Sequence, residues 1–100
     1  MIVVAGYAMV KPECRAEAVE AVHKVVQATK KEAGCLVYDF YADLADPNRF
    51  HVYEEWESDG ALDDHMDAAH TREFLAAIAG MGAGDSVVMR YTIAGAQRLL

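Results

Sequence analysis

Residues 35–57 of this 100-residue chain, CLVYDFYADLADPNRFHVYEEWE, contain two β-type segments separated by a turn. Both segments, 35–44 and 49–57, are rich in aromatic and β-branched residues, and their polarity alternates as in half-buried strands. The intervening ADPN, residues 45–48, has the composition of a tight turn. The stretch therefore predicts a β-hairpin, around which the other elements are arranged.

A strand and a helix precede this hairpin. Residues 2–10, IVVAGYAMV, are apolar throughout, which suits a strand covered on both faces. Pro12 favours the first position of a helix, and apolar residues recur at spacings of three and four from about 12 to 32. Gly34 supplies a C-cap, so the helix ends just before the hairpin.

A second helix and a last strand follow the hairpin. Ser58 is a good N-cap residue, and the helical pattern continues to about Met81, with a predicted break near Thr71. The glycines of GMGAGD, residues 80–85, stop the helix, and residues 86–96 predict the final strand.

The order strand, helix, strand, strand, helix, strand predicts an α+β fold of the ferredoxin-like βαββαβ type. One antiparallel sheet would carry both helices on one face, and we expect a single domain over residues 1–100. The other face of the sheet would be largely apolar and would need a cover. Two such sheets packed together in a homodimer would provide it.

The composition argues against several classes of partner. A formal net charge of −7 disfavours nucleic acid and anionic membrane surfaces, which both attract Lys and Arg. No apolar run is long enough to span a membrane, and the first residues lack a basic leader. Cys14 and Cys35 have no metal-site spacing, so we expect free thiols and a cytoplasmic protein.

Glu54 is the chemically unusual residue of the third predicted strand. Alternation places it with Phe50, Val52 and Trp56, on the face directed toward the helices. A carboxylate in such a position is most often structural, held by a hydrogen bond or a cation. The alternative is a functional group that has a raised pKa or that orients a histidine.

The sequence HMDAAH, residues 65–70, places two histidines beside the apolar stripe of the second helix. On a straight helix His65 and His70 would lie about 140° apart, so we expect no metal site. Both would lie at the rim between helix and sheet, where an imidazole can reach a ligand and exchange protons with water. Their structural alternatives are a satisfied boundary residue for His65 and a carbonyl cap for His70.

Three segments together resemble the antibiotic biosynthesis monooxygenase domain family, which includes bacterial quinol monooxygenases. They are GCLVYDFY (34–41), DPNRFHVYEEWES (46–58) and ALDDHMDAAHTREF (61–74). In that family Gly-Cys opens the second strand, Asp-Pro marks the hairpin, Glu-x-Trp ends the third strand, and two histidines precede an aromatic residue. The resemblance covers about residues 1–95.

This resemblance implies a dimeric α+β barrel made of two ferredoxin-like sheets. It also implies oxidation of a quinol, a polycyclic phenol or an anthrone by O₂, without metal, flavin or haem. His65 would then handle the proton, with His70 as the second candidate, and Glu54 would orient a partner or tune the site. The aromatic residues expected to bind the substrate are Trp56, Tyr7, Tyr38 and Phe74.

Three other functions remain open from the sequence. Haem-degrading relatives use an Asn on the first strand, where this chain has Gly6 and Tyr7 but no Asn. A non-catalytic dimer that binds small molecules is the second alternative. An isomerase acting on small lactones or ketones is the third.

Overall fold

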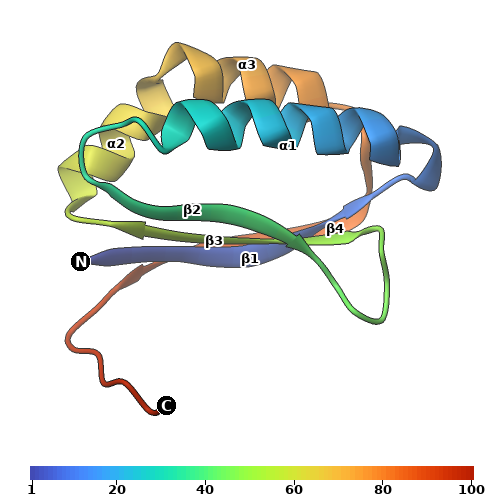
Figure 1. Cartoon of the computed structure of the whole chain (residues 1–100). Helices are drawn as coiled ribbons and strands as arrows, with labels where there is room; N and C mark the ends of the chain where they lie inside the picture. Colours follow the sequence, from blue (N-terminus) through green and yellow to red (C-terminus); the bar gives the residue numbers. More distant parts are fainter.

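The structure, a computed structural model, describes all 100 residues and contains one antiparallel sheet with the strand order β2-β3-β1-β4. The three α-helices lie on one side of this sheet, as Figure 1 shows. This is the predicted α+β ferredoxin-like arrangement. The elements are β1 (Ile2–Val10), the 3₁₀ turn η1 (Pro12–Cys14), α1 (Arg15–Thr29), β2 (Cys35–Ala42), β3 (Arg49–Trp56), α2 (Asp59–Asp67), α3 (Ala69–Ile78) and β4 (Gly82–Thr92).

The predicted hairpin is present, because β2 and β3 pair along their length. Two aspartates fix its turn by accepting hydrogen bonds from the backbone two residues further on. Asp43 accepts from the N–H of Ala45 at 2.8 Å, and Asp46 accepts from that of Asn48 at 2.9 Å. The alternation predicted for β3 is confirmed, since the buried residues of this strand are Phe50, Val52, Glu54 and Trp56.

Trp56 lies at the centre of the core, where its side chain is fully enclosed. It belongs to a cluster with Val4 of β1, Val25 of α1, Tyr38 of β2 and Leu62 of α2. As the last residue of β3, Trp56 therefore joins the sheet to the helical layer at the point where α2 begins.

The second helical region is interrupted at Ala68, three residues before the predicted break. α2 ends in a tight turn, because the Ala68 N–H bonds to the His65 carbonyl at 3.1 Å, and Ala68 itself is extended with ψ 144°. Thr71 caps no helix and instead lies buried in the first turn of α3. His65 and His70 are therefore not on one straight helix.

The last strand begins four residues earlier than predicted, at Gly82 rather than at residue 86. The glycine-rich segment, which by itself predicts a loop, pairs with β1 and places Gly82 opposite Val10. A register shift between Ala8 and Val10 accommodates this addition to the ladder. Pairing with the long β1 strand thus overrides the local turn tendency of glycine.

The face of the sheet opposite the helices is uncovered. On β4, every side chain is exposed, and the chain after Thr92 runs away from the sheet on this open side (Figure 1). The pairing register groups apolar side chains here, namely Val3, Ala5 and Tyr7 of β1 beside Tyr91, Met89 and Val87 of β4. We call these six residues the outer apolar face.

Candidate active site

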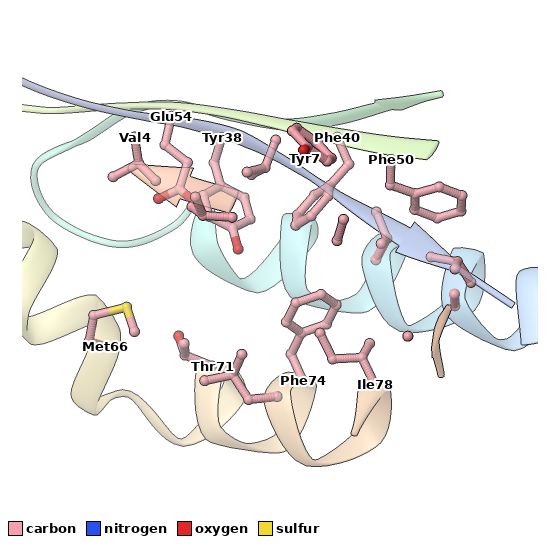
Figure 2. A pocket seen from close by; sticks show the side chains of 18 of the residues that line it. Val4, Tyr7, Tyr38, Phe40, Phe50, Glu54, Met66, Thr71, Phe74 and Ile78 are labelled. Carbon is pink, nitrogen blue, oxygen red and sulfur yellow. The ribbon is translucent and has the colours of Figure 1, made fainter. Parts of the chain in front are cut away.

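A cavity of about 480 Å³ lies between the sheet and the helical layer. In Figure 2, Glu54 and Tyr38 extend from the sheet, and Met66, Thr71 and Phe74 face them from the helices. Of the 24 residues that line the cavity, 19 are hydrophobic, so it suits a largely apolar ligand fixed by few polar contacts. The cavity is large enough for a small polycyclic molecule.

Glu54 is a buried carboxyl group at the wall of this cavity. Its Oε1 accepts a hydrogen bond from Trp56 Nε1 at 2.9 Å. Burial raises the pKa of Glu54 from 4.5 to about 7, against the lowering effect of the Trp56 bond, because the charged form loses its hydration. Glu54 therefore has the hydrogen bond expected of a structural carboxyl group, together with a raised pKa.

The raised pKa of Glu54 makes the stability of the fold depend on pH. The unfolded chain releases this proton near pH 4.5, whereas the folded protein holds it to about pH 7. The free energy of unfolding should therefore fall by up to about 3 kcal/mol as the pH rises through this window, and then level off. Urea denaturation between these pH values measures the slope. In Glu54→Gln the part of this pH dependence that Glu54 causes should disappear.

Glu57→Gln is the matched control, because Glu57 is exposed and should leave the slope unchanged. Equal slopes for wild type and Glu54→Gln would contradict the raised pKa.

His65 is the second titratable group at the cavity, and it is almost fully enclosed. Its Nδ1 lies 2.6 Å from Glu32 Oε2, and because a carboxylate oxygen only accepts, Nδ1 donates. The ring lies 4.8 Å from that of Trp56 and 5.2 Å from that of Tyr38. The structure gives Nε2 no hydrogen-bond partner within the chain, and the His65 side chain is one of those that line the cavity.

Glu32 is the residue that sequence reasoning missed. It follows the end of α1, and its Oε2 accepts from His65 and also from His70 Nε2, at 2.9 Å. The break at Ala68 makes this possible, because it turns His70 back toward the carboxylate that His65 already contacts. The available signal was a carboxylate at a helix C-terminus, where the helix dipole disfavours negative charge unless a partner is present.

Known proteins resemble this chain in both sequence and fold. The family model for "Antibiotic biosynthesis monooxygenase" matches residues 1–77. The chain belongs to this family. Among curated relatives, the uncharacterized protein sll1783 of Synechocystis is 33% identical over 98 residues, which are 98% of this chain and 67% of that protein. "Putative monooxygenase YcnE" of Bacillus subtilis is 34% identical over 76 residues, covering 76% and 80% of the two chains.

A solved structure of an antibiotic biosynthesis monooxygenase is also similar to this family member. The identity is 28%, with a TM-score of 0.88 and coverage of 95% of this chain and all of the other. The match confirms the ferredoxin-like fold, and the family and the name of YcnE support a monooxygenase-like function. In this structure no helix combines the length and the apolar character needed to cross a membrane.

The four aromatic residues expected to bind the substrate take different places in this family member. Tyr38 and Phe74 line the cavity (Figure 2), and burial raises the pKa of Tyr38 so that its hydroxyl stays protonated. Trp56 does not line the cavity. Its indole N–H instead donates a hydrogen bond to Glu54, and its ring packs against that of His65. Tyr7 borders the cavity, but its ring packs 3.9 Å from the Arg49 guanidinium and also near His51, on the outer side of the sheet.

Proposed function

We propose that this protein is a cofactor-independent monooxygenase that oxidises a quinol, or a related polycyclic phenol or anthrone, with O₂. One observation carries the proposal: the buried imidazole of His65 has one nitrogen fixed by a carboxylate, its other nitrogen has no partner within the chain, and the residue lines an apolar cavity. This arrangement gives His65 the tautomer of a general base, because the hydrogen is on Nδ1 and the lone pair is on Nε2.

The proposed reaction starts with transfer of the substrate hydroxyl proton to His65 Nε2. The resulting electron-rich anion transfers electrons to O₂, which forms a bond to a ring carbon. One oxygen atom stays on the product and the other leaves as water, so a quinol and O₂ give a hydroxyquinone and H₂O. An apolar cavity favours this chemistry, since it keeps bulk water from the anion and the reduced oxygen.

Glu54 would interact with the oxygen at the other end of the substrate. With a pKa of about 7, its carboxyl group can donate a hydrogen bond to a substrate anion or accept one from a hydroxyl. Tyr38 and Phe74 would form the walls around the rings. His70 has no contact with the cavity, and we assign it to orienting Glu32 and exchanging protons with water from the exposed side.

The test is oxygen uptake with a menadiol-like quinol in the absence of any added cofactor. Superoxide dismutase and catalase in the assay suppress free-radical autoxidation, which would otherwise mimic turnover. We expect one O₂ consumed per quinol and a product that contains one atom from ¹⁸O₂. A panel of quinols and anthrones with no uptake above the protein-free rate would overturn the proposal. A Soret shift on addition of haem would favour the haem-degrading alternative.

We also propose that the protein works as a homodimer through its outer apolar face. Three exposed apolar side chains of β4 support this, because water contacts 44–50% of Val87, Met89 and Tyr91 in the single chain. A cytoplasmic location is part of the same proposal, since both cysteines are free thiols.

Met89→Glu should convert this dimer to monomers, because it places two charges in the apolar contact between the sheets. Sedimentation velocity measures the change. Leu44→Glu is the control, since Leu44 is fully exposed outside the sheet and should leave the dimer intact. A wild-type protein that sediments as a monomer would disprove the proposed dimer.

A further inference from the structure

We propose that Glu32, His65 and His70 bind a divalent transition-metal cation of the Zn²⁺ type, and that a cation bound there switches off the base at His65. The cation is an inhibitor in this proposal and takes no part in the oxygen chemistry.

The three residues supply a recognised donor set. Two imidazole nitrogens and one carboxylate oxygen bind Zn²⁺ and related first-row cations. His65 Nδ1, His70 Nε2 and a Glu32 oxygen all lie within 4.8 Å of one another. No such site was expected from the sequence, because on one straight helix the two histidines would lie too far apart around the axis. The break at Ala68 means that they do not share one straight helix.

The atoms need to move only slightly to surround an ion. With bonds of about 2.1 Å, neighbouring ligand atoms are about 3.0–3.4 Å apart, and no two can be more than about 4.2 Å apart. The present N···O separations of 2.6 and 2.9 Å would therefore open by less than 1 Å. The two imidazole nitrogens lie within 4.8 Å of each other and would close by at most about 1.4 Å. His70 can make most of the adjustment, because its side chain is 27% exposed whereas His65 is held in the core.

One of the three proposed ligands, His70, also lines a cavity on the helical side, from which we infer that a cation reaches the cluster without entering the main cavity. A second cavity of about 110 Å³ opens between α1 and α3 and is lined by His70, Glu73 and Phe74. Phe74 also lines the main cavity, so this side chain lies between the two spaces. The chain's net charge of −7 favours the approach of cations in general.

A cation bound to this cluster would stop His65 from accepting a proton at the cavity. A neutral imidazole has one nitrogen lone pair, and a metal at Nδ1 uses it. The hydrogen then sits on Nε2, which can donate a hydrogen bond but cannot accept the substrate proton. Loss of turnover follows only if the proposed function holds, whereas cation binding itself does not depend on that function.

Co²⁺ is the spectroscopic probe for binding, and Zn²⁺ calorimetry gives the stoichiometry. Chelator-treated full-length protein should bind one Co²⁺ per chain and develop visible ligand-field bands. Glu32→Gln and His70→Ala should each weaken binding by at least about 100-fold, since loss of a direct ligand exceeds the 10–100-fold effect of losing an outer partner. Both residues are partly exposed, so these variants are expected to fold, and circular dichroism checks this.

Asp43→Asn is the matched control. It removes the carboxylate of the protein's other close His–carboxylate pair, in which His51 Nε2 lies 2.9 Å from Asp43 Oδ1 and no third ligand is present. Its affinity should equal that of wild type. Absence of Co²⁺ bands in wild type, or unchanged affinity in Glu32→Gln and His70→Ala, would overturn the site.

The inhibitory role is tested by adding Zn²⁺ to the quinol assay. Oxygen uptake should fall with the same affinity that calorimetry gives, and a chelator should restore it. Full turnover by the zinc-loaded protein would disprove the switch. Cation binding to a protein that turns over no quinol would instead contradict the proposed function and leave the metal site standing.

Discussion

His65→Ala should lower the turnover number for quinol oxidation by about 10²–10⁴-fold, the usual contribution of a positioned general base. The substitution removes the only cavity-lining imidazole and leaves the walls in place. The loss should be smaller at high pH, where more of the substrate is already ionised in solution. Steady-state oxygen uptake across a pH series measures both effects.

His23→Ala is the control for this prediction, because His23 lies exposed on α1 and should keep full activity. Added imidazole should restore part of the turnover of His65→Ala, since the deleted ring leaves room beside the cavity. Rescue separates a lost base from a distorted fold. If a folded His65→Ala protein retained wild-type turnover, the base would have to be another group, with Glu54 the next candidate at the cavity.

Trp56→Ala should lower the free energy of unfolding by about 3–5 kcal/mol, because it empties the most enclosed position of the core. The change also deletes the donor to Glu54 and the surface against which His65 packs. Urea denaturation followed by circular dichroism gives the difference. Activity should be lost together with stability, since Glu54 loses its hydrogen-bond donor and His65 loses the ring against which it packs.

Trp56→Phe separates packing from hydrogen bonding. Most of the apolar contact is kept, so the expected loss is about 1–3 kcal/mol, mainly from the unpaired Glu54 oxygen. The Trp56 bond lowers the pKa of Glu54, so its removal should raise that pKa further and extend the loss of stability to higher pH. The control for both Trp56 variants is Leu36→Ala, at a half-exposed position of β2, which should have little effect on stability.

A Trp56→Ala protein as stable as wild type would contradict the central place of Trp56 in the core.

The hairpin was predictable because its signals are local. Alternation along β3 alone places Glu54 and Trp56 on the inner face, and Asp and Pro residues mark the turn. The βαββαβ order then follows from the helical periods on either side. The family segments include both histidines, so the sequence also identified two of the three members of the cluster.

The remaining features depend on tertiary contacts. The start of β4 is set by pairing of Gly82 with Val10, which are 72 positions apart and share no local pattern. The partner of His65 is Glu32, across 33 positions, and only the tertiary packing of the helical layer, in which α1 lies against α3, brings them together. The angle between the histidines failed as a prediction because one extended residue, Ala68, is enough to redirect a helix.

The placement of the single tryptophan gives the molecule an optical reporter. The indole of Trp56 donates a hydrogen bond to Glu54 and lies against the ring of His65, and both of these groups line the cavity. Indole emission depends on the groups that contact the ring, so fluorescence intensity should change when the surroundings of Trp56 change. Ligand entry, cation binding and proton transfer could then be watched in solution without attaching a dye.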